Sequence, residues 1–600
     1  MTSIEGLYRQ RLAERQTALE AKERTHAAFA WTRIAVFLAG VAILVIGGPS
    51  RANWLVVPGG AFVVLVVAHL KLLNARDRAR SAVGFYARGL QRVTHDWIGK
   101  GRDGADVFSR VQRAGESHLF AVDIDLFGRA SLFEQLATVR THAGEETIAR
   151  WLLAPAEPET IRARQVAVRE LAGNLDLRER VAVLGDELRV AVHADLLRRW
   201  SAARIGLRGT GIRVAAALLA AGTASSLVWW TYTGRGVLIL AAFTAVQLGF
   251  VAFYKSRVTD VIKAVDEPAH DLELLAELLA TIEQHPCTSP GLKDLQRRIA
   301  STGRQASAEI RALSRLVAML SARNNVMFAI PAGILMWATQ WAFAIEAWRE
   351  RAGARIPEWL DVVGEFEALL AVSGFTAEQV GYVFPEVTDG GPAALEAVQV
   401  AHPAMGPSAV PNDIRLSAAQ GPALLVVSGS NMSGKSTLLR TIGANVVLAG
   451  MGAPVRAASF RMTPVAIGAS IRVVDSLADG RSRFMAEIVR LKEIVDRAKA
   501  GNGSVLFLLD EILSGTNSHD RLVGAEAVLT NLVGTGAIGF VTTHDLALGE
   551  IVQRLPGRAA NVHFEDQFEN GQLEFDYTLR SGVVQTSNAL RLMQSIGIDL

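Results

Sequence analysis

The sequence predicts an α/β domain at the carboxyl-terminal end of a chain that is otherwise helical, with two apolar helical hairpins inserted into the helical part. Three observations carry this prediction. The apolar run Leu424–Val427 leads into a glycine-rich loop and then into a segment with helical character. Pairs of apolar runs lie within residues 29–73 and 213–254, and each run is near the length of a helix that crosses hydrocarbon. The intervening segments are mostly helical in pattern.

The composition fits a protein of several domains with membrane segments. Six hundred residues are too many for a single hydrophobic core. Half of the residues (50%) are hydrophobic and the mean hydropathy is +0.24, which is high for a soluble enzyme and is most simply explained by membrane segments. The net charge of +3 does not by itself indicate a nucleic-acid-binding protein. The single cysteine, Cys287, excludes an internal disulfide and a cysteine-rich zinc site, and it fits a reducing, cytoplasmic setting.

The first hairpin is predicted at residues 29–73. Residues 1–28 form a polar lead without a signal-peptide pattern. Basic residues crowd both outer flanks of the hairpin, whereas its turn contains only Arg51. By the positive-inside rule, the N-terminus and the residues after Leu73 therefore face the cytoplasm.

The second hairpin is predicted at residues 213–254, around the tight turn 231–235. Basic residues again flank the pair on the outside, so the same orientation results. Trp229, Trp230 and Tyr254 fall where aromatic side chains prefer to lie at a membrane interface. The alternative is a pair of buried core helices in a soluble protein, but charge asymmetry and aromatic ends agree in both hairpins.

A further apolar stretch at 326–345 is long enough to span, but Pro331, Thr339 and Gln340 interrupt it. A fifth crossing would also place the carboxyl-terminal domain outside the cell. We therefore expect a buried or interfacial helix here. The remaining segments are predicted as linker helices at 74–122, core helices at 123–212 and 255–400, and the α/β domain at 401–600.

A phosphate-binding loop is predicted where the run Leu424–Val427 ends. Its spacing, Gly-x4-Gly-Lys-Ser, is that of the P-loop, in which backbone N–H groups and a helix N-terminus point at phosphate oxygens. Lys435 supplies charge for the outer phosphates, and the Ser436 hydroxyl can hold Mg²⁺. The alternative is a glycine-rich turn with a surface lysine, but the preceding strand and following helix favour the P-loop. The predicted nucleotide-binding residues are Gly429, Ser430, Asn431, Met432, Ser433, Gly434, Lys435, Ser436 and Thr437.

Two further apolar strands end in candidate catalytic residues. The run 504–509 is followed by Asp510, which can hold the Mg²⁺ shell, and by Glu511, which can orient and deprotonate the attacking water. Acidic pairs also occur in solvated turns, but the P-loop upstream favours the catalytic role. The run 538–543 ends at His544. A lone histidine is usually structural or solvated, so its role depends on this context.

These motifs resemble those of the MutS family. Residues 430–437 read SNMSGKST, which is similar to the family's N-M-x-G-K-S-T version of the P-loop. Residues 467–469 and 479–487 resemble its I-G-A and D-x-x-x-G-R-S-x-F-M-x-E regions, although the acidic residue stands closer to the glycine here. The order of elements in 141–171 is similar to the start of its core, or lever, domain. The resemblance implies an α/β P-loop NTPase of the ABC/MutS type, preceded by an all-α lever, that uses ATP and Mg²⁺ and dimerises.

The resemblance also implies roles for individual loop residues. Ser482, supported by Arg481, would complete the ATP site of the neighbouring subunit, and His544 would sense the γ-phosphate. The loop 514–520 would reach the dimer partner. Arg521 departs from the glycine that is usual after this loop.

The function expected from these features is that of a membrane-anchored, MutS-like ATPase. It would be a homodimer and a multi-pass protein of the inner or plasma membrane, with its N-terminus and ATPase domain in the cytoplasm, acting on duplex or structured DNA. The place of the family's mismatch-reading domain is taken by the polar lead and the first hairpin, so direct mismatch reading has no support in the sequence. Two alternatives stay open: an ATPase that drives a membrane-protein partner or a transport-type machine, and a nucleotide-gated membrane scaffold.

Overall fold

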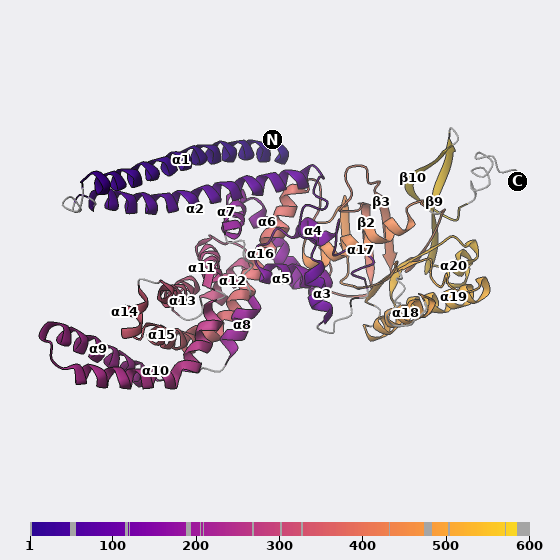
Figure 1. Ribbon diagram of the computed structural model, residues 1–600. Helices are drawn as coiled ribbons and strands as arrows, with labels where there is room; N and C mark the ends of the chain where they lie inside the picture. The colour runs from indigo at the N-terminus through magenta and orange to yellow at the C-terminus, as the bar shows by residue number, and fades with distance from the viewer. Residues whose placement is uncertain are drawn as a thin grey trace.

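The protein consists of an all-helical amino-terminal region and a carboxyl-terminal α/β region with two mixed sheets (Figure 1). The computed structural model describes residues 3–47, 54, 56–113, 118, 120–187, 194–203, 206–207, 209–266, 269–300, 303–325, 328–430, 432–472, 483–501, 504–569 and 572–584. The two regions that the sequence predicts are therefore both present.

The first hairpin consists of two long helices, α1 (Ile4–Gly47) and α2 (Val56–Val93), which pack along each other. Neither helix is interrupted at residue 28 or 73, where the sequence pattern predicts boundaries. The polar lead is rich in alanine, glutamate and arginine, which favour helix, so it continues the apolar segment without a break. The linker predicted at 74–122 is, as far as Val93, simply the second half of α2.

The helical core lies between the hairpins and the sheets. Its central helix, α16 (Ile356–Glu378), is buried over most of its length and packs against α5, α6 and α12. A Cβ atom on Gly364 of α16 would lie 2.6 Å from the carbonyl oxygen of Ala143, so glycine permits the close approach of α5. The core helices are α3 (Ala105–Arg113), α4 (Leu132–Leu136), α5 (His142–Leu153), α6 (Pro158–Ala172), α7 (Leu175–Glu187), α8 (Ala194–Ala202), α11 (Ala269–Gln284), α12 (Pro290–Ile299), α13 (Ala306–Ser321) and α16.

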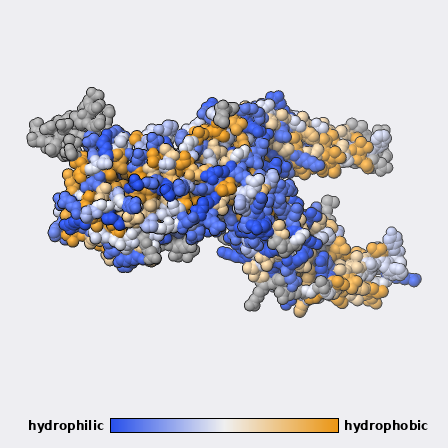
Figure 2. All heavy atoms as spheres, turned by 180° about the vertical axis from the view of Figure 1, so that it is seen from behind, coloured by the Kyte–Doolittle hydropathy of each residue, from blue (hydrophilic) through white to orange (hydrophobic). Residues whose placement is uncertain are grey.

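The second hairpin consists of α9 (Thr210–Thr233) and α10 (Val237–Asp266). Gly234 follows α9 in the left-handed conformation, with φ +66°, and ends that helix. Both hairpins extend from the helical core toward the same side (Figure 1). Among the described residues, α1, α2, α9 and α10 are the helices whose length and apolar composition would allow a membrane crossing. Hydrophobic residues cover much of both hairpins, while the core between them is largely hydrophilic at its surface (Figure 2).

The stretch 326–345 is not one helix, contrary to the sequence prediction. It contains α14 (Ala329–Ile334) and the start of α15 (Trp337–Ala352), separated by a turn at Leu335 and Met336. Met336 has φ +50°, outside the helical region, which separates the two helices. Gln247 of α10 donates from Nε2 to the carbonyl oxygens of Gly333 and Ile334, at 3.0 and 3.2 Å. These bonds add to the turn bond from the N–H of Met336 to the carbonyl oxygen of Gly333, at 3.2 Å, at the end of α14.

The larger sheet has the strand order β10-β9-β4-β8-β7-β6. Its strands β9, β4, β8, β7 and β6 are parallel, and β10 is antiparallel to β9. The strand before the P-loop, β4, is therefore separated from the acidic strand β7 by β8 alone. The strands are β4 (Leu424–Ser428), β6 (Ala466–Ser470), β7 (Val505–Asp510), β8 (Ile538–Thr543), β9 (Ala559–Glu569) and β10 (Gln572–Ser581).

The smaller sheet has the order β1-β5-β2-β3 and begins before residue 401. Because α16 ends at Glu378 and the first strand starts at Glu386, the helical segment predicted at 255–400 ends earlier than expected. Strands β1 and β2 were missed because β1 is only two residues long and β2 alternates polar and apolar residues imperfectly. The strands are β1 (Glu386–Val387), β2 (Ala394–Val400), β3 (Asn412–Ser417) and β5 (Ser459–Met462).

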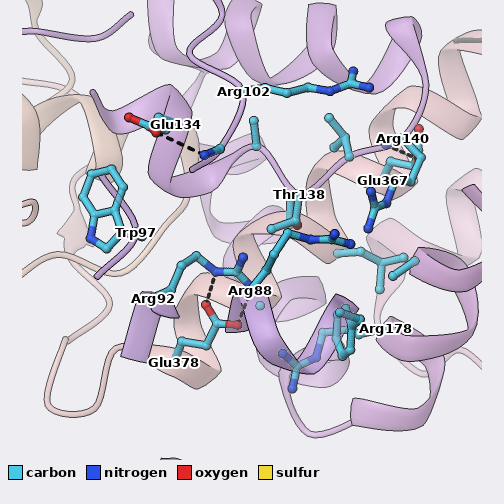
Figure 3. Close-up of a pocket in the computed structure, with 18 of the residues that line it drawn as sticks. Arg88, Arg92, Trp97, Arg102, Glu134, Thr138, Arg140, Arg178, Glu367 and Glu378 are labelled. Atoms are coloured by element: carbon cyan, nitrogen blue, oxygen red, sulfur yellow. Dashed lines mark hydrogen bonds and ion pairs between the residues drawn. The ribbon is translucent and has the colours of Figure 1, made fainter. Parts of the chain in front are cut away.

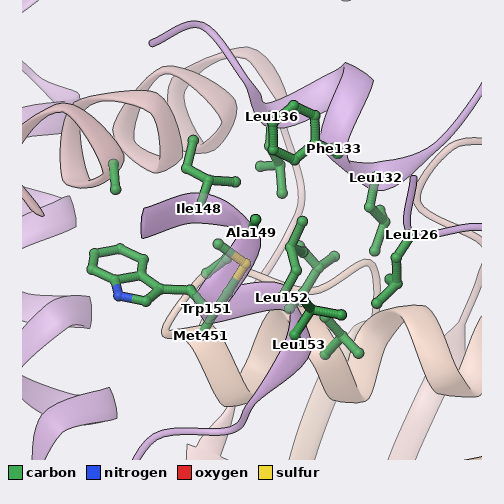
Figure 4. Packing of buried hydrophobic residues seen from close by; sticks show 14 of the residues in the cluster. Leu126, Leu132, Phe133, Leu136, Ile148, Ala149, Trp151, Leu152, Leu153 and Met451 are labelled. Atoms are coloured by element: carbon green, nitrogen blue, oxygen red, sulfur yellow. The ribbon is translucent and has the colours of Figure 1, made fainter. Parts of the chain in front are cut away.

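The helical core and the α/β region share one apolar cluster. In Figure 4, the side chains of Leu152, Leu153 and Trp151 from α5 lie close to Met451, the last residue of α17. The helices of the α/β region are α17 (Lys435–Met451), α18 (Arg483–Ala500), α19 (Ser518–Gly534) and α20 (Ile551–Arg554). The P-loop helix is therefore packed directly onto the helical core.

Candidate nucleotide site

The P-loop connects β4 to α17, as predicted, and requires glycine at two positions. Gly434 has φ +100° and immediately precedes α17. A Cβ atom on Gly429 would lie 2.7 Å from Ser433 Oγ, closer than such atoms can approach. Met432 also has positive φ, at +78°, and its side chain is exposed. The result is a tight loop that ends at a helix N-terminus, which is a favourable place for an anion.

Lys435 lies buried beneath this loop. Its Nζ donates to the carbonyl oxygens of Gly429 and Ser430, both at 2.8 Å, and lies 3.8 Å from Glu511 Oε1. Burial lowers the pKa of Lys435, although the nearby charges of Glu511 and Asp510 oppose this effect. The ammonium group is thus held at the loop by fixed acceptors.

The candidate magnesium residues are in direct contact. Ser436 Oγ, in the first turn of α17, donates to Asp510 Oδ2 at 2.6 Å. Thr542 of β8 donates through Oγ1 to the other carboxylate oxygen of Asp510. Because β8 lies between β4 and β7, the sheet order brings the ends of all three strands to one edge.

Glu511 follows the strand end in a special backbone conformation, with φ +46°. Its N–H donates to Thr542 Oγ1 at 3.1 Å, which turns the residue away from the strand direction. Glu511 Oε1 lies 3.4 Å from His544 Nδ1. The three candidate catalytic residues, Lys435, Glu511 and His544, therefore meet around one carboxylate.

A cavity of about 790 Å³ opens beside these side chains. Two aromatic residues that line it, Phe564 of β9 and Tyr577 of β10, were not identified from the sequence. Neither belongs to a motif, and both strands follow His544 in the chain. His402 also lines the cavity, and burial lowers its pKa to about 4. The predicted residues among its walls are Met432, Gly434, Lys435, Ser436, Thr437, Asp510 and Glu511.

The residues present fit a nucleotide with Mg²⁺. Ser430 Oγ and Ser433 Oγ are buried in the P-loop without a hydrogen-bond partner in the described part of the chain, and both can serve phosphate oxygens. A hydroxyl and a carboxylate, from Ser436 and Asp510, are oxygen donors of the kind that Mg²⁺ prefers. Three predicted site residues, Asn431, Arg481 and Ser482, lie outside the described residues.

The amino-terminal half of the chain reaches this site through Asp123. Its Oδ1 accepts the backbone N–H groups of Ile471 and Arg472, both at 2.7 Å, just before the segment that leads to Ser482. Its Oδ2 lies 3.0 Å from Arg490 Nη1 of α18. Burial raises the pKa of Asp123, whereas these donors oppose the increase. No sequence motif indicated this contact.

Arg521, the residue that departs from the family pattern, forms an ion pair within the chain. Its Nη2 lies 2.9 Å from Asp545 Oδ2, directly beside His544. The backbone N–H of Ala547 and the bond from Arg521 lower the pKa of Asp545. Arg521 therefore contacts the residue that follows His544.

Comparisons with known proteins agree with this geometry. Residues 425–599 match the family model of MutS domain V. The DNA mismatch repair protein MutS of Myxococcus xanthus is 32% identical over 256 residues, which are 41% of this chain and 28% of that protein. Its counterpart in Anaeromyxobacter sp. (strain K) is 35% identical over 281 residues, 44% of this chain and 30% of that protein. DNA mismatch repair protein MutS 2 of Haloarcula marismortui is 32% identical over 278 residues, 42% of this chain and 28% of that protein.

The chain thus spans less than a third of the length of these relatives. The similarity is concentrated in the carboxyl-terminal part, where the P-loop, the acidic strand end and the histidine strand end meet at one sheet edge. MutS domain V is a domain of the P-loop NTPase type. In its carboxyl-terminal part, the chain is thus similar to MutS domain V.

Proposed function

We propose that the protein binds and hydrolyses ATP with Mg²⁺ at the P-loop cavity. The observation that carries this proposal is the convergence of Lys435, Ser436, Asp510, Glu511 and His544 at one edge of the parallel sheet. Each side chain has the chemistry that phosphoryl transfer requires, and they come from three separate strand ends.

The proposed mechanism assigns a separate task to each group. Lys435 and the loop N–H groups hold the outer phosphates, and Ser436 and Asp510 hold the metal ion, which when bound neutralises developing phosphate charge. Glu511 orients water and accepts its proton. His544, 3.4 Å from that carboxylate, responds to the position of the γ-phosphate.

The direct test is Glu511→Gln in the full chain. We expect ATP hydrolysis to fall by at least about a hundredfold, in the range for loss of a general base, while ATP binding is retained. Glu493→Gln, on the exposed face of α18, is the matched control and should hydrolyse ATP normally. Unchanged hydrolysis in Glu511→Gln would exclude this residue as the base.

We further propose a homodimer in which Arg481 and Ser482 complete the partner's ATP site. The support is the MutS domain V match, which includes both residues. Mixing Lys435→Ala with Ser482→Ala chains tests this arrangement. In the mixed dimer one site receives both defects and the other receives neither, so we expect activity to recover to a fraction of the parent value. If each variant is inactive alone and the mixture also hydrolyses no ATP, the proposed arrangement of the dimer is contradicted.

The two hairpins are proposed to anchor the protein in the plasma membrane with the ATPase domain in the cytoplasm. The support is their length, their exposed apolar surface and their common direction from the core. In inside-out vesicles, a protease site placed in the turn 231–235 should be protected, whereas one placed after Lys100 should be cut. Cleavage of the turn from the cytoplasmic side would contradict this topology.

We propose that the protein acts on DNA, because the relatives named above are DNA mismatch repair proteins. Binding to duplex and branched DNA should weaken as salt increases, since phosphate contacts release counterions. The control is a mismatched duplex, for which we expect no preference over the matched duplex. No salt-sensitive binding to any of these DNAs would exclude the proposal.

A further inference from the structure

A second cavity, of about 270 Å³, lies at the junction between the first hairpin and the helical core. It is bounded by the second half of α2, the loop after it, α7 and α16 (Figure 3). It shares no lining residue with the P-loop cavity. Six cationic side chains line it, from four separate stretches of the chain: Arg88, Arg92, Lys100, Arg102, Arg140 and Arg178.

The three carboxylates in the wall do not balance this charge. Glu134 accepts two backbone N–H groups, and Glu367 accepts two backbone N–H groups and a hydroxyl. Glu378 is held by Arg92 and by the hydroxyl of Tyr8. The carboxylates are thus engaged by donors of the protein. Asp96 and Glu145, which lie outside the wall, pair with Lys100 and Arg102, so the six cations face five carboxylates.

The cavity also contains buried donors that need an acceptor. Arg178 is 6% exposed, and its Nε has no hydrogen-bond partner among the described residues. Its other nitrogens donate to Tyr8 Oη and to the carbonyl oxygen of Ala172, so no carboxylate in the described chain pairs with it. Trp97, 3% exposed, likewise has an indole N–H without a partner. Buried donors without acceptors are costly, and an anion would satisfy such groups.

We propose that this cavity binds a small soluble organic phosphate, such as a phosphate ester or diphosphate. A phosphate group matches the guanidinium groups of the wall, above all the buried Arg178, because guanidinium groups bind phosphate in a bidentate way. The volume is close to the lower limit of small-molecule sites. Because the lining comes from α2, α7 and α16, the ligand would hold the first hairpin against the core.

A lipid headgroup has the same chemistry but lies too far away. If the hairpin anchors the protein as proposed above, the apolar run of α2 ends near Leu70. Arg88 follows on the same helix, roughly 27 Å further at about 1.5 Å per residue. The site therefore faces the cytoplasm, well beyond the headgroups.

The test is a calorimetric titration of inorganic pyrophosphate into the full-length, detergent-solubilised protein. The protein carries Lys435→Ala, because this substitution weakens phosphate binding at the P-loop. We expect binding that persists in this background and weakens as salt increases. Adding Arg88→Gln should weaken it at least tenfold. Ala137→Phe fills the cavity without changing charge and should abolish it. Arg297→Gln, on the exposed face of α12, is the matched control and should bind like the parent.

Three results would overturn the proposal. The first is the absence of pyrophosphate binding in the Lys435→Ala background, and the second is unchanged affinity in folded Arg88→Gln and Ala137→Phe. The third is displacement of pyrophosphate by phosphatidylglycerol vesicles but not by phosphatidylcholine vesicles, which would assign the site to a lipid. None of these results depends on ATP hydrolysis, so the proposed ATPase function stands or fails separately.

Discussion

The two apolar hairpins are alike in composition but join the body of the protein in different ways. The first hairpin is joined through buried polar groups: Arg92 Nε lies 2.6 Å from Glu378 Oε2, and Tyr86 donates to Glu179 Oε2 at 2.6 Å. Tyr86 is fully buried, yet in the described part of the chain it does not belong to the large apolar cluster. The second hairpin is joined through that cluster, which includes Val261 and Val265 of α10.

This difference separates two ways of coupling a hairpin to a core. Hydrogen bonds and ion pairs are directional, so the junction of α1 and α2 accepts one orientation. Apolar packing is not directional, and it dominates the junction of α10 with α13 and α15. The first hairpin is thus joined to the core by directional polar contacts, whereas the second is joined mainly by apolar packing.

The largest effect is expected from breaking the polar junction. Glu378→Ala leaves Arg92 buried without its carboxylate, and loss of one partner of a buried pair costs about 3–5 kcal/mol. Hydrogen–deuterium exchange in residues 84–93 should rise strongly, while exchange in α10 stays unchanged. Glu5→Ala, which removes an exposed partner of Arg9 on the same hairpin, is the control and should change little. Unchanged exchange in α2 would show that the polar junction is not what holds it.

A smaller effect is expected from the apolar junction. Val265→Ala removes two methyl groups from the cluster, at a cost of about 2 kcal/mol. Exchange should rise at the end of α10 and in α13, and not in α1 or α2. Val237→Ala, at the exposed start of the same helix, should leave exchange unchanged. A rise in α2 would mean that the two junctions are coupled.

The smallest effect is expected from acid, through a buried carboxylate that supports the second hairpin. Burial raises the pKa of Glu309, but the hydrogen bonds and charges of Arg351 and Arg304 outweigh it and hold the pKa below its ordinary value of 4.5. A lowered carboxyl pKa stabilises the fold above 4.5, and this contribution is lost as pH falls through the folded value.

Exchange in α13 and α15 should therefore increase as the pH falls below 4.5. Glu309→Gln cannot titrate, so its exchange should depend less on pH over the same interval. Glu283→Gln is the matched variant. Glu283 lies on α11, and its carboxylate accepts the N–H of Ser307, which lies on α13 as Glu309 does. An equal pH response in the parent and in Glu309→Gln would assign the effect to other groups.

The sequence predicted those strands, loops and helices whose residue pattern is contained in one short segment of the chain. The strand, loop and helix around residues 424–443 were expected because glycine, lysine and serine stand at fixed spacing, and β4 and α17 lie there. The strand ends at Asp510 and His544 were expected for the same reason. Their assignment to one catalytic site is a prediction that activity measurements must test.

Contacts between distant segments could not be predicted in this way. Tyr577 lines the P-loop cavity because β10 pairs with β9, and β9 pairs with β4, which no single segment encodes. The break at Met336 lies beside Gln247 of another helix, which donates to the carbonyl oxygens of Gly333 and Ile334. The continuity of α1 was missed because its residues change from polar to apolar near residue 28, which resembles the start of a new element. No residue there interrupts the helix.

Through its contacts with Ile471 and Arg472, Asp123 joins the carboxyl-terminal α/β region to a segment far from it in the sequence. A fragment that begins at Glu386 would contain the complete larger sheet but would lack this carboxylate. Two backbone N–H groups would lose this acceptor, and Arg490 would lose one of its partners. Gly443 would lose the side chain of Ile124 against which it packs. The isolated α/β region is therefore an incomplete folding unit, and its boundary in the sequence is not its boundary in space.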